Sequence, residues 1–270
     1  SGELPTDRAL AVVEELAKLG FEELKITGGE PLVRRDIIDI LRAIDGKGIS
    51  FDLSTNASRI NKELARELSK LNLKYIHVSL DGGSKEVQER IRGAKSFDST
   101  HRGLRLLQEA GVPVRIGSVI CKDNQESLDQ IVDCAVNVGA REIIFSRMIA
   151  AGRLRGNREA ESDLDNHSLI KSIKQLQERY LGKIVVSNNI EGAEYICSRC
   201  PGGDSFIYID NLGHVLPCTW AVESGLVSLS SRTLSHYSLD LLLKGEEIQR
   251  FRFQLHSEDI IGCPISGQEG

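Results

Sequence analysis

Residues 26–31 read Ile-Thr-Gly-Gly-Glu-Pro and end a short apolar run that predicts a strand. Gly28 and Gly29 allow a ligand to come close to the backbone, and the Glu30 carboxylate can hold an ammonium group. Pro31 restricts the direction in which the chain leaves the turn. The stretch therefore predicts a pocket for a small molecule with an amino group, and an ordinary strand-to-helix turn is the alternative.

Helix and strand patterns alternate around this stretch, from residue 6 to about residue 150. Apolar, β-branched runs predict strands at 24–27, 49–54, 75–80, 112–120 and 142–147. Amphipathic segments predict helices at 6–19, 35–44, 61–71, 85–91, 99–110 and 125–138. Strict alternation with short turns indicates a parallel sheet with right-handed crossovers. We therefore expect an α/β fold, a partial (β/α) TIM-type barrel that lacks its first strand.

Polar residues gather where the predicted strands end. They are Gly28 to Glu30, Ser54 to Asn56, Ser79 with Asp81, Lys122 to Asn124, and Arg147. In a barrel or partial barrel the carboxyl ends of the strands form the active-site face. We therefore expect a ligand site at this edge of the sheet.

The regular alternation of helix and strand patterns ends near residue 150. Residues 151–195 predict a polar connector with one helix (169–180) and one short strand (184–187), and residues 206–218 predict a β-hairpin that turns at Asn211-Leu212-Gly213. Cysteines lie near the mouth of this hairpin. We expect three regions: a partial barrel at 1–150, the connector at 151–195, and a small cysteine-containing hairpin domain at 196–270.

Composition excludes several classes of function. The net charge of −5 argues against nucleic-acid binding through a general basic field. No apolar run is long enough to span a bilayer and no signal peptide is visible, so we expect a cytoplasmic protein without membrane contact. Four of the six cysteines lie in the C-terminal region, a pattern that favours a metal over disulfides in such a protein.

Five segments, taken in order, resemble the radical S-adenosylmethionine (SAM) superfamily, and within it the enzymes with a SPASM or twitch C-terminal domain. They are residues 27–31, 53–56, 77–82 with 90–93, 114–116 with 122–124, and the spacing Cys200-x12-Gly213-x4-Cys218. The resemblance covers nearly the whole chain. It implies the partial barrel and a SAM site at its strand ends.

The resemblance also implies roles for individual residues. The residues implied around the amino group of SAM are Gly28, Gly29, Glu30 and Pro31. Those implied for its ribose or carboxylate are Ser54, Thr55, Asn56 and Ser79. Arg115 would pair with a carboxylate, and Met148 would lie near the adenine. Helix capping is the alternative for residues 54–56, and for Asp81 a turn-capping role is as well supported as a direct one.

The chain departs from the family pattern at one motif. The family holds a [4Fe–4S] cluster with Cys-x3-Cys-x2-Cys, whereas the first cysteine here is Cys121. We expect the missing motif upstream of a fragment, and therefore no catalytic residue within this chain. One auxiliary [4Fe–4S] cluster is expected at the C-terminal cysteines, with zinc as the alternative. Its expected ligands are Cys197, Cys200, Cys218 and Cys263.

The resemblance implies an oxidoreductase-type radical enzyme. The intact protein would cleave SAM reductively to methionine and a 5′-deoxyadenosyl radical, which would abstract hydrogen from a peptide or other small-molecule substrate. An electron donor such as flavodoxin or ferredoxin would be a partner. The first alternative is a radical SAM enzyme that acts on a tetrapyrrole or cofactor precursor. The second is a non-catalytic module that binds SAM and a metal.

Overall fold

The computed structural model describes residues 2–148, 162, 164–190, 200–219, 221–222 and 227–257. It contains two compact units. The larger unit comprises residues 23–45 and 50–191, and the smaller comprises residues 1–22, 46–49 and 192–270.

The larger unit is built on a six-stranded parallel sheet in the order β1-β2-β3-β4-β5-β6. Its strands are β1 (Glu23–Ile26), β2 (Ser50–Thr55), β3 (Leu73–Ser79), β4 (Val114–Ile120), β5 (Glu142–Arg147) and β6 (Val185–Asn188). The prediction of a parallel α/β fold is confirmed. The sequence reading counted only the first five strands in the sheet. The short strand of the expected connector is β6, and it joins the sheet by pairing Val186 with Ile143 of β5.

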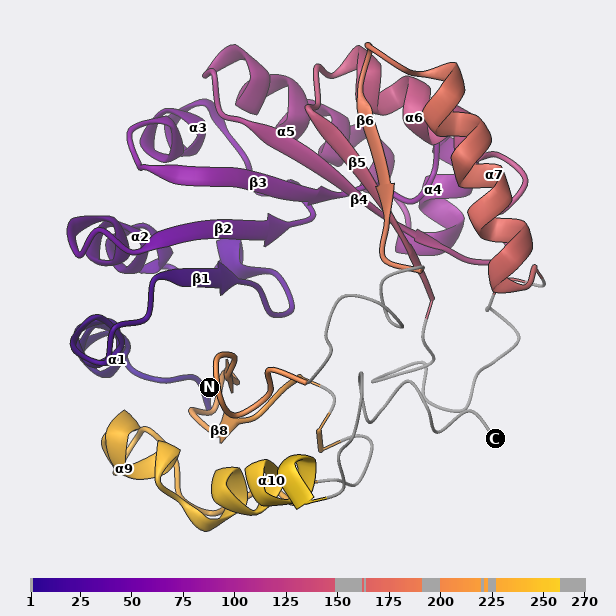
Figure 1. Cartoon of the computed structure of the whole chain (residues 1–270). Helices are drawn as coiled ribbons and strands as arrows, with labels where there is room; N and C mark the ends of the chain where they lie inside the picture. Colours follow the sequence, from indigo (N-terminus) through magenta and orange to yellow (C-terminus); the bar gives the residue numbers. More distant parts are fainter. Residues whose placement is uncertain are drawn as a thin grey trace. The chain divides into compact units, whose positions relative to one another are not determined.

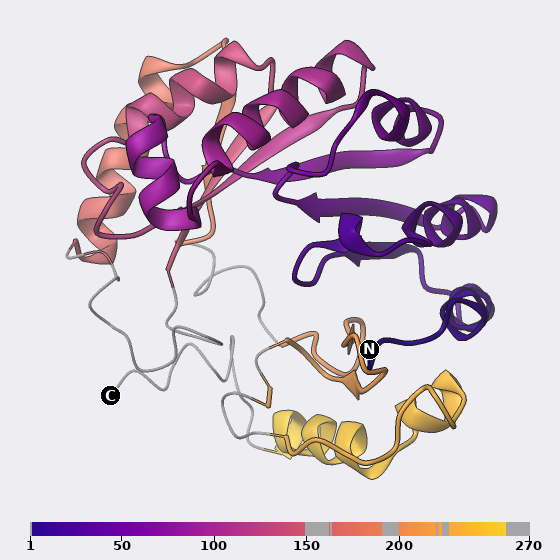
Figure 2. The ribbon, with the colours of Figure 1, turned by 180° about the vertical axis from the view of Figure 1, so that it is seen from behind.

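The helices of this unit lie along the outer face of the curved sheet, as Figures 1 and 2 show. They are the 3-10 turn η1 (Pro31–Val33), α2 (Ile37–Gly46), α3 (Lys62–Ser69), α4 (Lys85–Arg92), α5 (Ser96–Glu109), α6 (Leu128–Asn137) and α7 (Asn166–Arg179). Asn61 caps α3 and Asp165 caps α7 by accepting backbone hydrogen bonds at 2.8 and 2.7 Å. These starts are therefore fixed by local sequence. Across the described residues, no helix has both the length and the apolar character that a membrane span requires.

The sheet has an apolar outer face and a polar inner face. In β4 the buried side chains of Val114, Ile116 and Ile120 alternate with half-buried Arg115 and Val119. Neighbouring strands keep the same alternation where their residues pair one to one, and the pairing of β2 with β3 shifts register between Phe51 and Leu53. The residues that we call the inner face are Lys25, Asp52, Ser54, Tyr75, His77, Ser79, Arg115, Gly117 and Glu142.

The smaller unit joins the two ends of the chain. It contains α1 (Thr6–Lys18), β7 (Tyr208–Ile209), β8 (Val215–Leu216), α9 (Leu239–Leu243) and α10 (Glu246–Ser257). Arg8 donates a hydrogen bond to the carbonyl of Tyr237 at 2.8 Å, and Glu15 accepts one from the backbone of Leu239. This grouping differs from the boundaries expected at residues 150 and 195, because contacts over more than 200 residues leave no local pattern.

The predicted hairpin is present as antiparallel β7 and β8. Its turn is organised by the Asp210 carboxylate, which accepts hydrogen bonds from the backbone of Leu212 and His214 at 2.9 and 2.8 Å. The same carboxylate meets Nδ1 of His214 at 2.7 Å. An aspartate that bonds backbone groups two and four residues ahead is a common way to close a turn, so the hairpin follows from its own sequence.

Candidate functional site

The carboxyl ends of four neighbouring strands bring the predicted polar residues to one edge of the sheet. Glu30 follows β1, Thr55 ends β2, Ser79 ends β3 and Asn124 follows β4. In open parallel sheets, ligands bind in the crevice outside these strand ends. The geometry around each residue decides whether it faces a ligand or supports the edge.

Glu30 is held by three hydrogen bonds from the chain itself. Its Oε1 atom accepts from the backbone of Leu32 at 3.1 Å and from the hydroxyl of Thr55 at 2.6 Å. Its Oε2 atom accepts from the backbone of Asn56 at 2.7 Å. The carboxylate therefore connects the loop after β1 to the end of β2.

The same carboxylate can still accept a ligand. A carboxylate offers about four acceptor positions, and three are occupied here. Glu30 is half-buried, so its remaining position on Oε2 is not enclosed by the core. A negatively charged group with an acceptor position left over suits an ammonium ion such as the amino group of SAM.

Gly28 and Gly29 leave open space beside this carboxylate. Gly28 has φ of +143°, a conformation that other residues rarely adopt. A Cβ atom at either position would meet no atom within 4 Å. The glycine at position 28 is therefore explained by backbone conformation, and the space beside both glycines is available to a ligand. Pro31, the fourth residue of the predicted group, begins η1.

Thr55 and Asn56 use their side chains to build the turn after β2. The Thr55 hydroxyl donates to Glu30 and accepts from the backbone of Ala57 at 3.0 Å. The Asn56 side-chain oxygen accepts from the backbone of Ser58 at 2.8 Å. These contacts match the capping alternative, so both residues support the edge. Ser54 points to the inner face, next to His77 of β3.

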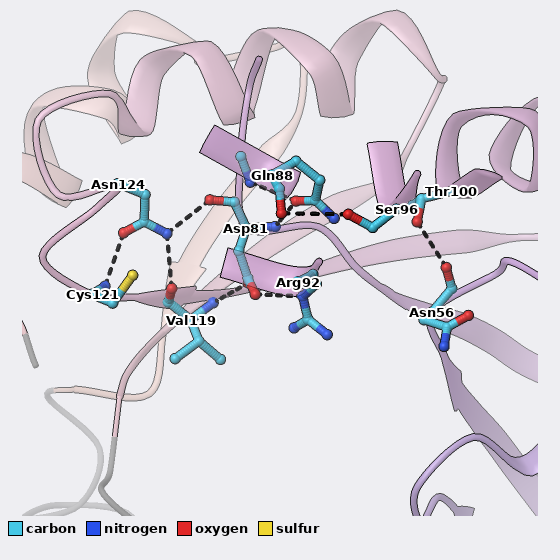
Figure 3. A network of polar contacts seen from close by, with 10 residues as sticks. Asn56, Asp81, Gln88, Arg92, Ser96, Thr100, Val119, Cys121 and Asn124 are labelled. Carbon is cyan, nitrogen blue, oxygen red and sulfur yellow. Dashed lines mark hydrogen bonds and ion pairs between the residues drawn. The ribbon is translucent and has the colours of Figure 1, made fainter. Parts of the chain in front are cut away.

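Asp81 is the centre of a buried network after β3, shown in Figure 3. Its side chain is only 3% exposed and forms an ion pair with Arg92. It also accepts a hydrogen bond from the backbone of Val119 at 2.8 Å. Asn124 donates to the carbonyls of Asp81 and Val119 at 2.8 and 2.9 Å. Asp81 thus ties the end of β3 to the end of β4, consistent with its expected turn role.

Gln88 is a structural member of this network that the sequence did not reveal. Its side-chain oxygen accepts hydrogen bonds from the backbone of both Asp81 and Gly82 at 2.8 Å, and the residue is fully buried. A glutamine between charged residues of an amphipathic helix carries the sequence signal of a surface position. Only the close approach of α4 to the turn shows its role: a Cβ atom on Gly82 would lie 2.2 Å from the backbone nitrogen of Gln88.

Arg115 lies at the same level of the sheet as Ser54, because Ser54 pairs with His77 of β3 and His77 pairs with Arg115 of β4. It is the second residue of β4, so it lies well before the end of its own strand. The predicted partner, a carboxylate, comes from the protein: Arg115 pairs with Glu142 at 2.7 Å and stacks on the Tyr75 ring at 3.7 Å. Met148, in contrast, follows β5 at the expected edge.

Two ionisable groups on the inner face have altered acidity. Burial raises the pKa of Asp52, and Glu23 adds to this effect while Lys25 opposes it. Burial lowers the pKa of His77, with a further contribution from the Arg115 cation. Each shift favours the neutral form of its group over the charged form.

Two of the C-terminal thiols, those of Cys200 and Cys218, lie within the described residues. Cys200 and Cys218 flank the hairpin and pack against one apolar cluster that includes Leu216, Phe251 and Leu255. Thiol ligands on a common surface suit an iron–sulfur cluster or zinc. Two of the four expected ligands, Cys197 and Cys263, lie outside the described residues.

A solved structure shares this fold. The crystal structure of Streptococcus suis SuiB matches with a TM-score of 0.76 at 17% identity, over 91% of this chain and 60% of that chain. SuiB bound to its precursor peptide SuiA matches with a TM-score of 0.75. At this level of identity the likeness establishes the fold, and it confirms the expected partial barrel.

Several curated proteins are similar in sequence. AdoMet-dependent heme synthase of Methanosarcina barkeri is 27% identical over 81% of this chain and 68% of that protein. Fe-coproporphyrin III synthase of the same organism is 32% identical over 66% of this chain and 44% of that protein. PqqA peptide cyclase of Granulibacter bethesdensis is 27% identical over 93% of this chain and 68% of that protein. The chain thus spans 44% to 68% of the length of these relatives.

A family model matches the N-terminal half of the chain. The model described as the radical SAM superfamily matches residues 1–135, half of the 270-residue chain. That match includes Glu30, the turn after β2 and the Asp81 network. The chain therefore belongs to the radical SAM superfamily.

Proposed function

We propose that this protein is a radical SAM enzyme that modifies a peptide or protein substrate. The observation that carries the proposal is the Glu30 carboxylate, which joins the ends of β1 and β2 and keeps one acceptor position for an ammonium group. It lies within the part of the chain that matches the superfamily.

The proposed SAM site divides the edge residues into two groups. Glu30, with the backbone at Gly28 and Gly29, would hold the amino group of SAM. Ser54 and Ser79 lie on the inner face of their strands and would bind its ribose or carboxylate. The remaining predicted residues shape this site: Thr55 and Asn56 hold Glu30 in place, Pro31 begins η1, and Met148 borders the site beyond β5.

Members of this superfamily use SAM with a [4Fe–4S] cluster, which together supply a carbon-centred radical that removes hydrogen from the substrate. The chain's own residues bind and orient SAM, because a radical reaction requires the reacting atoms to be held in contact. Reduction requires an electron donor, for which we propose flavodoxin or ferredoxin.

We also propose a metal site at Cys197, Cys200, Cys218 and Cys263. The placement of Cys200 and Cys218 against one apolar cluster supports it. An auxiliary [4Fe–4S] cluster is our first choice and zinc is the alternative, because four thiolates suit either.

The substrate class has two candidates. The similarity to PqqA peptide cyclase extends over 93% of this chain and supports a peptide. Similarity to a heme synthase and to Fe-coproporphyrin III synthase supports a tetrapyrrole as the second candidate. A binding assay with iron coproporphyrin III tests the second candidate directly, because tight binding would displace the peptide proposal.

The experiment that tests the activity uses the full-length protein, loaded with iron and sulfide under anaerobic conditions. We expect dithionite and SAM to yield 5′-deoxyadenosine, measured by liquid chromatography. Glu30→Gln should lower this yield, and Glu126→Gln, at an exposed position, should not. Failure of the iron-loaded wild type to form 5′-deoxyadenosine would contradict the proposal and favour a non-catalytic binding module.

A further inference from the structure

The inner face carries an imidazole that the proposed SAM site does not yet use. His77 lies in β3, two residues before Ser79. Its neighbours Ile76 and Val78 are completely buried on the outer face, so His77 and Ser79 both point to the inner face. The contacts that a Cβ atom on Gly117 would make show where its ring lies.

The His77 ring leans across to the neighbouring strand and occupies the space above Gly117. A Cβ atom on Gly117 would lie 2.1 Å from Nε2 of His77 and 2.7 Å from its Cδ2 atom. Gly117 is the partner of Ser79 in the sheet, whereas the partner of His77 is Arg115. The ring therefore extends from the level of Arg115 toward the carboxyl edge and reaches the level of Ser79. It lies over β4, about one strand spacing of 4.8 Å from Ser79 on β3.

The charges around the ring come from four strands. Arg115 of β4 and Lys25 of β1 disfavour the protonated ring, and Glu142 of β5 favours it, while burial has the largest effect. Asp52 of β2 also lies on the inner face, and burial raises its own pKa. The nearest aromatic neighbour on the same strand is Tyr75, on which Arg115 stacks. Within the described part of the chain, the His77 nitrogens have no hydrogen-bond partner.

We propose that His77 faces bound SAM beside Ser79, and that only its neutral form allows tight binding. SAM carries a positive sulfonium. A protonated imidazole would place a second positive charge in the same half-buried site, and the two charges would repel each other. Gly117 makes this arrangement possible, since any other residue there would displace the ring. The inference rests on the proposed SAM site and adds a residue that makes SAM binding depend on pH.

The sign of the pH dependence follows from the direction of the pKa shift. Because the pKa of His77 lies below the ordinary value of 6.5, the ring is neutral at pH 7. SAM affinity should stay constant at neutral pH and fall as the pH decreases below that value. Two charges about 8 Å apart at an effective dielectric constant of about 20 imply a weakening of about 30-fold. By linkage, bound SAM should lower the pKa of His77 further.

The test compares SAM with S-adenosylhomocysteine, whose sulfur is neutral. Calorimetry on the cluster-loaded, full-length protein, kept oxidised so that SAM is not consumed, gives both affinities from about pH 8 to about pH 5. We expect the ratio of the two affinities to fall about 30-fold in the wild type, and to become nearly constant in His77→Gln and His77→Phe. His101→Gln is the matched control, because burial lowers the pKa of His101 as well and it lies on α5.

A second measurement does not depend on any variant. Exchange of the imidazole C2 hydrogen, followed by mass spectrometry, reports the pKa of each histidine with and without SAM. We expect SAM to lower the pKa of His77 and leave that of His101 unchanged. Equal pH profiles for SAM and S-adenosylhomocysteine, or a persistent decrease in His77→Gln, would overturn the proposal while the SAM site remains. Absence of SAM binding at every pH would overturn both.

Discussion

The Glu30 carboxylate has two tasks at the carboxyl edge of the sheet. It accepts the Thr55 hydroxyl and the Asn56 backbone, which fixes the loop after β1 against the end of β2. It also keeps an acceptor position for a ligand. These bonds give Glu30 a role in stability, in addition to the binding role proposed above.

Glu30→Gln should therefore weaken both properties. The amide presents one acceptor oxygen instead of two and directs an NH2 group at one of the donors, so one hydrogen bond is lost. We expect the free energy of unfolding to fall by about 1 to 3 kcal/mol, and SAM affinity to fall about 10- to 100-fold because the ammonium loses its charged partner. Urea unfolding and calorimetry measure the two effects. Loss of stability with unchanged SAM affinity would remove Glu30 from the ligand site.

The ion pair between Asp81 and Arg92 gives a second prediction at the residue scale. Asp81 is buried, whereas the Arg92 side chain is 29% exposed. Asp81→Asn should lower the free energy of unfolding by about 2 to 3 kcal/mol, because the amide cannot accept from both Arg92 and Val119 equally well. In a double-mutant cycle with Arg92→Met, the double variant should lose less than the sum of the single variants. If the losses in the free energy of unfolding were additive, the interaction between Asp81 and Arg92 would not contribute to stability.

At the scale of elements, the turn after β3 is built on close approach between backbones. The first turns of α4 pack directly on Gly82, and the side-chain oxygen of Gln88 accepts a hydrogen bond from the Gly82 backbone. The equivalent turn after β2 is fixed differently, by Thr100 of α5, which donates to the carbonyl of Asn56 at 2.9 Å. Two neighbouring strand ends are thus positioned by helices that pack behind them, and the ligand edge depends on this support.

Gly82→Ala tests this packing. The added methyl group would lie 2.2 Å from the backbone nitrogen and 2.6 Å from the Cα atom of Gln88, neither of which can move without displacing α4. We expect a loss of about 3 kcal/mol or more in the free energy of unfolding. Gly46→Ala is the control, since nothing lies within 4 Å of that position. Its effect should stay within about 1 kcal/mol. Similar effects of both substitutions would contradict the packing argument.

At the scale of the whole molecule, each compact unit has its own chemistry. The larger unit presents the carboxyl edge of a parallel sheet, and the smaller unit presents thiols beside a hairpin. The smaller unit depends on both ends of the chain, because Arg8 of α1 bonds to Tyr237 and Glu15 bonds to Leu239. Removal of residues 1–18 would therefore affect the thiol-bearing unit, although α1 lies far from it in sequence.

Simultaneous Cys200→Ala and Cys218→Ala substitutions should remove one metal site. We expect the anaerobically purified protein to lose the iron, or the zinc, of that site in elemental analysis, because two thiolate ligands are too few to retain it. Cys134→Ala is the control: its thiol bonds to the carbonyl of Gly83 in the larger unit, so metal content should not change. Equal metal content in all three proteins would contradict the thiol site.

The elements of the fold could be predicted because they depend on local patterns. Strand and helix periods, the capping residues Asn61 and Asp165, and the Asp210 turn all act within a few residues of the chain. The sequence predicts β6 only as a short strand within a connector, because the sequence of a short strand does not indicate which strand it pairs with. The candidate edge could be predicted as well, since parallel strands always end on the same side.

The sequence by itself determined the parallel α/β architecture, the polar residues at its carboxyl edge and the cysteine-bearing hairpin. Only the tertiary structure decided what each of these residues contacts. Glu30 bonds to Thr55 at the end of β2 and to Asn56 after it, and Gln88 bonds to the turn after β3. Arg115 pairs with Glu142 of its own chain, and the His77 ring occupies the space above Gly117. The physical reason is that such contacts depend on strand register and on helix packing. Both join residues that are distant in the chain, and neither leaves a periodic signal in the sequence.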